Sequence, residues 1–324
     1  MELIGHVRAI RVLCEVAGHG SFSAAAEALG LTQSAVSQHV AALERQTGLP
    51  LVERSTRPLG LTDAGHALVR HGRAINARLD SAEQDLAEIA GRRARRLRFG
   101  SFPTALTTFV PGALARLRSR QPGTALTVVD DHLQGLLPRL TDGELDLAVI
   151  YDSAALAGSP RFEGGRVHLF DDTFQAVLPR GHRAAAAGRT VELTDLAEDV
   201  WVGGRPGSAW FTIVRHSCRA IGFDPRVSLT SDDYRAVQAF VAAGLGVAVI
   251  PGLAVVRAPA DVEVRQLRVG APVRRISVAY PDSAYQPPVV REMISILEGV
   301  TQRLRGDPPT SDATPAQPAR RRRR

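Results

Sequence analysis

Lysine is absent from this 324-residue chain, and cysteine, asparagine and aromatic residues are scarce. All 40 basic residues are therefore arginines, a bias that we attribute to codon usage in a GC-rich genome rather than to function. Cys14 and Cys218 lie far apart in helical patterns, so we expect two small buried residues and no disulfide framework. A redox switch would need two paired thiols or one activated thiol, and is the less favoured interpretation.

Long apolar runs are also missing. No stretch approaches the roughly 20 apolar residues that span a bilayer. The first residues lack the charged-then-apolar order of a secretory signal. We therefore expect a cytoplasmic protein that has no membrane partner.

Recognisable catalytic motifs are missing as well. The chain contains no G-x-S-x-G, H-E-x-x-H, paired C-x-x-C or Walker loop. His66 and His71 are five residues apart on an expected helix, so their side chains point in different directions. The glycines at 244 and 246 fall between a helix and a buried strand, where a helix stop is favoured over a phosphate loop. We predict no enzyme activity, no metal site and no cofactor.

The basic charge is unevenly distributed. The net charge of +7 divides into +2 over residues 1–96, 0 over 97–300 and +5 over 301–324. The tail from 305 to 324 is rich in Pro, Thr and Ala and ends in five arginines, a composition that predicts disorder. Total charge is therefore no argument for nucleic-acid binding, which has to be argued from the positions of individual arginines.

Residues 20–65 carry the most informative pattern of the chain. Ser21 and Ser23 are both residues that cap the start of a helix. An alanine-rich run of high helix propensity follows and ends at Gly30. Thr32 then caps a second short helix, which we expect to extend to Arg45. The pattern predicts two helices joined by a tight turn.

The second of these helices has two unlike sides. At 3.6 residues per turn, Val36, Val40 and Leu43 share an apolar stripe that must be buried. The outward side carries Ser34, Gln38, Ala41, Ala42 and Arg45, with Gln33 and Ser37 on its flanks. Gln and Ser can hydrogen-bond base edges, and small alanines allow close approach in a major groove. The alternative is a solvated helix face, but such faces usually carry Glu and Lys.

Both flanks favour DNA binding. Upstream, apolar residues from Leu3 to Ala17 recur at helical spacing and predict a first helix that completes a three-helix core. Downstream, residues 48–61 predict a short hairpin with Arg54 and Arg57 near its tip. A basic hairpin beside a recognition helix forms a winged helix-turn-helix, although the two arginines could also be ordinary surface charge.

The segments GSFSAAAEALGLTQSAVSQHVAALE and LPLVERSTRPLGLTDAG resemble the amino-terminal domain of LysR-type transcriptional regulators. The resemblance implies that Gln33, Ser34, Ser37 and Gln38 face base edges or phosphates and that the wing arginines hold the DNA backbone. Val52 departs from the family, in which an aromatic residue is common at this position. The expected DNA-binding residues are Thr32, Gln33, Ser34, Ser37, Gln38, Arg45, Arg54 and Arg57.

A long helix is expected from Thr62 to about Gly91. Leu68, Ile75, Leu79, Ala82, Leu86 and Ile89 form a heptad-like seam. The seam could pack on the helix's own domain, but a dimer is the better interpretation, because two winged modules read two half-sites together. The arginine-rich segment 91–96 would then be a charged hinge.

Beyond residue 96, strands alternate with helices. We expect strands at 97–100, 125–130, 145–150, 174–178, 201–202, 227–230, 247–250 and 276–280, and helices at 104–120, 132–141, 208–221, 233–243 and 288–303. The segments LRFGSF, GELDLAVI and FVAAGLGVAVIPG resemble the LysR-type effector domain, which is itself similar to periplasmic solute-binding proteins. The resemblance implies two lobes joined by crossing strands.

A ligand in such a fold binds outside the carboxyl ends of the strands. The turn at 101–104 offers hydroxyls and N–H groups that could hold an anion, and Trp201 could line an apolar wall. By resemblance the cleft binds a small-molecule inducer, often a carboxylate. The candidates are Ser101, Phe102, Thr104, Trp201, Gly203, Ser231 and Asp232, each of which could instead be a helix cap or turn residue.

Together these patterns predict an α/β protein in four parts. They are a winged helix-turn-helix at 1–61, a dimerisation helix and hinge at 62–96, a two-lobed effector domain at 97–304 and the disordered tail. Lobe 1 would span about 97–168 and 274–304, and lobe 2 about 169–273. We expect a homodimeric or homotetrameric regulator that binds double-stranded DNA and a small effector, with RNA polymerase as a further candidate partner. The alternative is a solute-binding module with a dimerisation helix and no DNA function.

Overall fold

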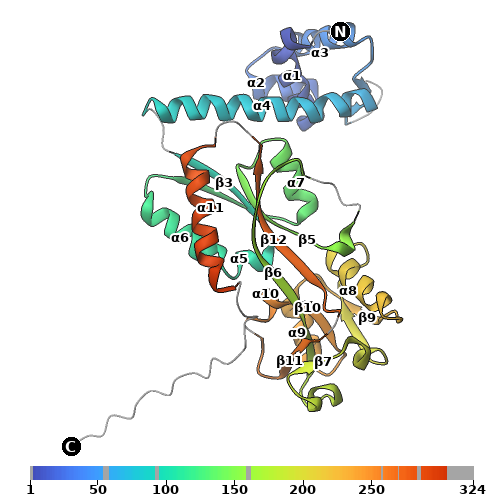
Figure 1. Cartoon of the computed structure of the whole chain (residues 1–324). Coiled ribbons are helices and arrows are strands. Elements are labelled where there is room, and N and C mark those ends of the chain that lie inside the picture. Colours follow the sequence, from blue (N-terminus) through green and yellow to red (C-terminus); the bar gives the residue numbers. More distant parts are fainter. Residues whose placement is uncertain are drawn as a thin grey trace, which may run out of the picture.

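A small helical head, one long helix and a two-lobed α/β body follow one another along the chain (Figure 1). The structure is a computed structural model that describes residues 3–53, 58–91, 95–157, 162–256, 258–268, 270–282 and 286–304. The tail predicted at 305–324 and the wing residues Arg54 and Arg57 lie outside these ranges. Among the described residues, no helix combines the length and apolarity that a bilayer crossing requires.

The head contains the predicted three helices and the base of a wing. Its elements are η1 (Ile4–His6), α1 (Val7–His19), α2 (Phe22–Leu29), α3 (Gln33–Thr47), β1 (Val52–Glu53) and β2 (Gly60–Leu61). Side chains from all three helices form one buried core that is separate from the core of the body. The strands β1 and β2 pair antiparallel, with Val52 opposite Leu61.

The helix boundaries in the head follow from local capping. The hydroxyl of Ser21 accepts a hydrogen bond from the N–H of Ala24, and Thr32 caps α3 through the N–H of Ala35 at 3.2 Å. Gly30 ends α2 in the left-handed region at φ 63°, where a glycine avoids the steric strain of a side chain. The predicted helix–turn–helix is therefore confirmed, with Ser21 rather than Ser23 as the cap of α2.

The long helix α4 (Asp63–Ile89) packs closely against the head at two of its glycines. A Cβ atom on Gly65 would lie 2.0 Å from the backbone oxygen of Leu51. One on Gly72 would lie 2.5 Å from a side-chain carbon of Ile10. Glycine thus allows α4 to pack directly on the wing base and on α1. Further along, Ile75, Leu79 and Leu86 remain 39 %, 48 % and 64 % exposed.

The body contains most of the secondary structure. Its strands are β3 (Arg96–Ser101), β4 (Ala125–Asp130), β5 (Leu147–Asp152), β6 (Gly164–Pro179), β7 (Thr190–Val191), β8 (Val200–Gly203), β9 (Arg226–Thr230), β10 (Ala248–Pro251), β11 (Val262–Leu267) and β12 (Val273–Pro281). Its helices are α5 (Pro103–Leu106), α6 (Val110–Arg120), α7 (Leu133–Thr141), α8 (Ala209–Ala220), α9 (Tyr234–Ala242), α10 (Gly252–Val255) and α11 (Pro288–Thr301). Short 3-10 turns are η2 (Ala154–Leu156), η3 (Arg183–Ala187), η4 (Leu193–Leu196) and η5 (Gln302–Leu304).

One sheet connects the two lobes. Its strand order is β4-β3-β5-β12-β6-β11-β7, with β10 also paired to β6. The first half of β6 pairs antiparallel with β12 in lobe 1, and its second half pairs with β10 and β11 in lobe 2. Strands β8 and β9 form a separate parallel pair in lobe 2.

The helices of lobe 1 cover its sheet unequally. Buried side chains of α6 and α11 share the large core that continues into lobe 2. On the opposite face, Leu136, Leu137 and Leu140 of α7 form a smaller core with Leu145, Ala148 and Ile150. Figure 1 shows α11 and α7 on either side of β12. Helix α7 therefore packs mainly in this smaller core, and only its first residue, Leu133, also packs against the main core.

The structure differs from the expected elements at several places, among them the short helix α10, which was not predicted. The single helix expected at 104–120 is divided into α5 and α6, because the chain turns at residues 107–109 before Pro111 at the start of α6. The strand expected at 174–178 is the second half of the 16-residue β6. Strands β7 and β11 were not predicted, since each is short or only partly buried and lacks a clear apolar alternation.

The close contact at Gly65 yields a test of the head. We expect Gly65→Ala to lower the free energy of unfolding of the head by about 1–3 kcal/mol, because the added methyl group meets backbone that cannot rotate away. Gly18→Ala is the matched control, since nothing lies within 4 Å of a Cβ there. Thermal melts followed by circular dichroism would contradict the packing if both variants melted alike.

Candidate DNA interface and ligand cleft

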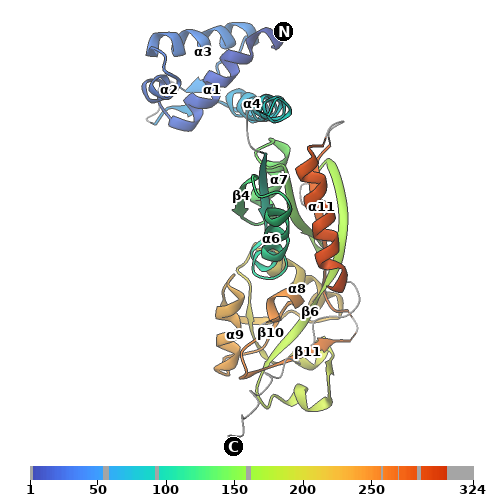
Figure 2. The same cartoon turned by 90° about the vertical axis from the view of Figure 1, so that its left-hand side faces the viewer.

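Helix α3 separates an apolar side from a polar side, as its sequence predicted. Val36, Val40 and Leu43 are fully buried. The polar residues Thr32, Gln33, Ser34, Gln38 and Arg45 are exposed, and Ser37 is half-buried. Figures 1 and 2 both place α3 at the end of the molecule farthest from the body. A duplex can therefore approach this edge without meeting the body.

Hydrogen bonds fix the ends of that edge. The hydroxyls of Thr32 and Ser34 lie 3.0 Å apart, so the start of α3 is ordered by its own side chains. Near the other end, Oε1 of Glu44 accepts a hydrogen bond from the N–H of Leu51 at 3.0 Å. This bond ties the recognition helix to the chain that enters the wing, so the two parts of the interface are held in one geometry.

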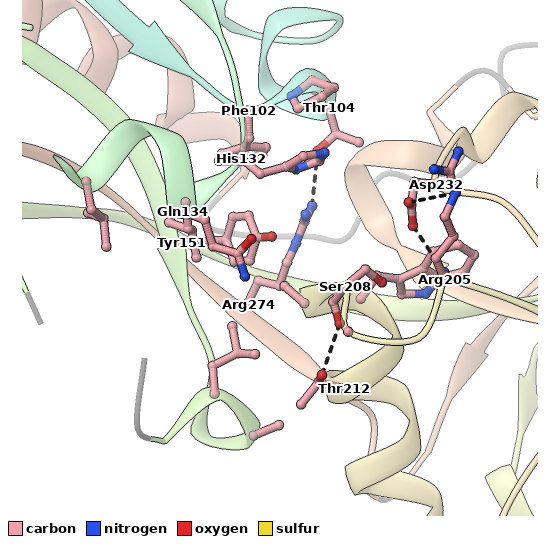
Figure 3. A pocket seen from close by; sticks show the side chains of 18 of the residues that line it. Phe102, Thr104, His132, Gln134, Tyr151, Arg205, Ser208, Thr212, Asp232 and Arg274 are labelled. Atoms are coloured by element: carbon pink, nitrogen blue, oxygen red, sulfur yellow. Dashed lines mark hydrogen bonds and ion pairs between the residues drawn. The ribbon is translucent and has the colours of Figure 1, made fainter. Parts of the chain in front are cut away.

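A cavity of about 780 Å³ lies between the two lobes of the body (Figure 3). Lobe 1 contributes the turn before α5, the start of α7 and Tyr151 at the end of β5. Lobe 2 contributes the loop into α8 and the start of α9, and Arg274 of β12 lies at the base. Its labelled side chains are Phe102, Thr104, His132, Gln134, Tyr151, Arg205, Ser208, Thr212, Asp232 and Arg274. The volume is that of a typical small-molecule site.

The base of the cleft is an ion pair between Arg274 and Asp172. Nη2 of Arg274 donates to Oδ2 of Asp172 at 2.6 Å, and both side chains are only 4 % exposed. The same nitrogen donates to the hydroxyl of Thr104 at 3.2 Å, and the guanidinium carbon lies 4.9 Å from the ring centroid of Tyr151. The other carboxylate oxygen accepts from the N–H of Leu253 at 3.0 Å. One pair thus joins lobe 1, both crossing strands and lobe 2.

Burial dominates the electrostatics at this base. Loss of water raises the pKa of the Asp172 carboxyl, while the charge and hydrogen bonds of Arg274 oppose the rise. Burial also raises the pKa of the Tyr234 hydroxyl, so this group stays a neutral phenol. At the rim, Oδ1 of Asp232 accepts a hydrogen bond from the backbone N–H of Arg205, and its Oδ2 forms an ion pair with Nε of the same residue. Each of the two arginines in the cleft is therefore paired with a carboxylate.

Aromatic rings form much of the remaining wall. Phe102 and Tyr151 meet edge to face with centroids 5.1 Å apart, and Trp210 and Tyr234 lie 4.9 Å apart on the side of lobe 2. The indole N–H of Trp210 donates to the carbonyl of Val249 at 2.8 Å, which fixes the ring. The cleft therefore combines rigid apolar walls with a few polar groups.

Three of the seven effector-site candidates from the sequence line the cleft, namely Phe102, Thr104 and Asp232. Trp201 does not: it is buried in the core of lobe 2, where its indole N–H donates to the carbonyl of Leu196. Gly203 lies beside it around a void of about 10 Å³. Ser101 is fully buried and does not line the cleft. The hydroxyl of Ser231 accepts from the N–H of Asp233 in a turn.

Several lining residues were missed by the sequence analysis, above all Tyr151, Trp210, Tyr234 and Arg274. Tyr151 directly follows a predicted strand, and Trp210 and Tyr234 open predicted helices, so strand and helix ends could have indicated them. Arg274 gave no such signal. It is the second residue of β12 and is followed by another arginine, and its burial depends on Asp172, about 100 residues away in the chain.

A polar recognition helix on a winged head and a ligand-sized cleft in a two-lobed body define a class of protein, the ligand-responsive DNA-binding regulators. Family models agree with this. The model described as "Bacterial regulatory helix-turn-helix protein, lysR family" matches residues 7–66, and the LysR substrate binding domain matches residues 90–302. The chain belongs to the LysR family of transcriptional regulators.

Individual relatives agree with the family. A "Probable hydrogen peroxide-inducible genes activator" of Mycobacterium avium is 32 % identical over 300 residues, which cover 90 % of this chain and 93 % of the relative. The "HTH-type transcriptional regulator CbbR" of Rhodospirillum rubrum is 30 % identical, with 76 % of this chain and 79 % of the relative covered.

Solved structures share the fold. A full-length OxyR variant from Pseudomonas aeruginosa has a TM-score of 0.65 at 24 % identity, with 90 % of this chain and 97 % of that chain covered. Full-length CbnR in complex with its target DNA has a TM-score of 0.62 at 22 % identity, covering 93 % of this chain and 100 % of that chain.

These findings decide between the two functions considered from the sequence. The protein is a DNA-binding transcriptional regulator with an effector-binding domain, and it is not an enzyme. Regulators of this family bind DNA and small-molecule effectors and form oligomers. A solute-binding module without DNA function has no support.

The buried ion pair yields a stability test. We expect Asp172→Asn to lower the free energy of unfolding by about 3–5 kcal/mol, because Arg274 is left buried without a counter-charge. A double variant with Asp172→Leu and Arg274→Met should be more stable than the single variant, since it removes both charges. Urea denaturation measures both, and a double variant that is less stable than the single one would contradict the argument.

Proposed function

We propose that the cleft between the lobes holds the effector of this regulator and that the effector is a small planar carboxylate. The side-chain charges of Arg274 and Arg205 are already paired, so the attraction for an anion comes from backbone N–H groups at the starts of α7 and α8. His132 offers no side-chain cap to α7, but the N–H of Gly135 already donates to the His132 carbonyl and the Asp131 carboxylate lies against Gly135. The N–H groups of Leu133 and Gln134 are therefore the ones that can meet a ligand. The aromatic walls suit a planar apolar body.

Peroxide sensing through a thiol is the main competing function, because relatives carry the name of peroxide-inducible activators. Cys14 and Cys218 do not favour it. Burial raises the pKa of the Cys14 thiol to about 11 and that of Cys218 to about 12, so both are almost entirely protonated at neutral pH. Neither lines the cleft. A reactive thiol needs the opposite environment, with a lowered pKa and access to solvent.

For DNA, we propose that the exposed edge of α3 reads bases in a major groove. Gln33, Ser34, Ser37 and Gln38 would contact base edges or phosphates, with Thr32 and Arg45 at the two ends of that edge. Arg54 and Arg57 lie outside the described residues, and their role in holding the DNA backbone stays a prediction.

We further propose that two copies pair through α4. The exposed Ile75, Leu79 and Leu86 keep the heptad-like spacing of the seam, and burying them would remove apolar surface from water. A dimer would present two heads to two half-sites. A tetramer, RNA polymerase as a partner and a cytoplasmic location stay predictions.

DNA recognition can be tested with two variants. We expect Gln38→Ala to weaken binding to the specific site about tenfold and to leave nonspecific binding unchanged, because one bidentate base contact is lost. Arg54→Ala should weaken binding to every sequence and reduce its salt dependence. The specific site is first located by footprinting on the DNA that flanks the protein's own gene. Fluorescence anisotropy titrations on that site and on a scrambled duplex then measure the specific and the nonspecific affinity of each variant. Equal losses on both duplexes for Gln38→Ala would refute base reading.

Effector binding can be tested with tryptophan fluorescence. Aromatic and aliphatic carboxylates are screened by thermal shift. Both tryptophans are buried, but only Trp210 lines the cleft, so we expect a hit to change the emission of Trp210 and not that of Trp201. The change should therefore disappear in Trp210→Phe and persist in Trp201→Phe, while both variants keep their thermal shift. A hit that still alters emission in Trp210→Phe would place the ligand outside the cleft.

A further inference from the structure

Helix α7 touches the cleft at one end and the long helix α4 at the other. His132, Leu133 and Gln134 at its start line the cavity, as do Leu137 and Pro138 one turn later. The nine-residue helix is about 13 Å long at 1.5 Å per residue. It ends in a turn at residues 142–144, which lies against α4. Figures 1 and 2 both show α7 between the body's strands and α4.

The contact with α4 involves backbone and small side chains. Gly143 adopts φ 75°, and a Cβ atom on it would lie 3.3 Å from Cβ of Ala77 and 3.8 Å from the backbone nitrogen of Arg78. The turn can hardly move toward α4 without a steric clash, because no flexible side chain separates the two. A displacement of the turn therefore has to move α4 or break the contact.

Opposite charges face each other at the same place. Burial raises the pKa of the Asp142 carboxyl, and neighbouring Glu144 raises it further, whereas Arg73, Arg70 and His71 of α4 oppose the rise. The acidic turn of the body thus lies in the positive field of α4. This attraction favours the contact over separation of the two parts.

Helix α7 is joined to lobe 1 mainly through a separate small core, and only Leu133 at its start also packs against the main core. Its Leu136 and Leu140 pack in the small core of lobe 1, apart from the main core that holds α6, α11 and lobe 2 together. Pro138 lies inside the helix and has no N–H to donate, so one backbone hydrogen bond of the helix is missing. At the far side, α4 packs on α1 of the head at Gly72, so a movement of α4 reaches the DNA-binding domain.

We propose that α7 transmits occupancy of the cleft to α4, through the contact between Gly143 and Ala77, within a single chain. The proposal rests on the proposed function, since it takes the cleft to be the effector site. A ligand that contacts the start of α7 shifts the helix along or across its sheet face. The turn at 142–144 then moves against α4, so that α4 and the attached head change their position relative to the body.

The test uses a covalently attached probe, so no natural effector is needed. Gln134→Cys is alkylated with N-phenylmaleimide, which places an aromatic group in the cleft against α7. The native thiols are poor competitors because burial raises the pKa of both. Hydrogen–deuterium exchange is then compared with and without the label. We expect exchange to change at least about twofold in peptides from 139–145 and also from 70–80.

A matched label in the other lobe separates transmission through α7 from a general response. Thr212→Cys also lines the cleft but lies on α8, so its labelled form should alter exchange around α8 and leave 70–80 unchanged. Equal effects of both labels on α4 would overturn the proposal. So would a label at 134 that leaves 139–145 unchanged, or one that changes 139–145 but not 70–80.

A second variant tests the contact itself. Ala77→Glu places a negative charge against Asp142 and Glu144, and Ala90→Glu, at the exposed residue that follows α4, is its control. In the labelled Gln134→Cys background, Ala77→Glu should keep the response at 139–145 and abolish that at 70–80, whereas Ala90→Glu should keep both. A response at 70–80 that survives Ala77→Glu would overturn the proposal. Failure of all carboxylates to bind would refute the proposed effector class. The labelling experiment would still test transmission through α7, because its probe is attached covalently.

Discussion

The ion pair between Asp172 and Arg274 is the interaction on which the geometry of the body depends. It lies where the crossing strands leave one lobe for the other, and its hydrogen bonds reach Thr104 in lobe 1 and Leu253 in lobe 2. A charge buried this deeply needs its partner in place, because an unpaired charge in the interior is strongly destabilising. The pair therefore fixes the floor of the cleft and the relation of the lobes at the same point. Any ligand that settles on this floor meets groups already ordered by the fold.

The head depends on a simpler constraint, the division of α3 into two sides. Full burial of Val36, Val40 and Leu43 forces the opposite edge outward, and the glutamine and serine side chains there have no competing role in the core. Two glycines in α4 bring that helix against the wing base and α1. The orientation of the recognition helix is thus fixed relative to α4, so that whatever positions α4 also positions the head.

Local rules predicted much of this molecule and failed where contacts are long-range. Caps at Ser21 and Thr32 and the apolar stripe of α3 are properties of a few neighbouring residues, so the head could be predicted from the sequence almost completely. Strand and helix ends indicated Phe102, Thr104 and Asp232 in the cleft. The prediction that Trp201 lines the cleft failed, because a large aromatic residue at a strand end can face the core as readily as a cleft. Arg274 could not be predicted, since its burial depends on a partner about 100 residues away that no local pattern indicates.

Strand β6 belongs to both lobes at once, pairing with β12 in one and with β10 and β11 in the other. Neither lobe can therefore be cut out as an autonomous folding unit, because each would lose half of a continuous central strand and expose the edge beside it. The modular boundary of this protein lies instead before β3, where a single chain segment enters the body. Swapping heads among relatives at that boundary preserves every strand pairing, whereas recombining single lobes does not.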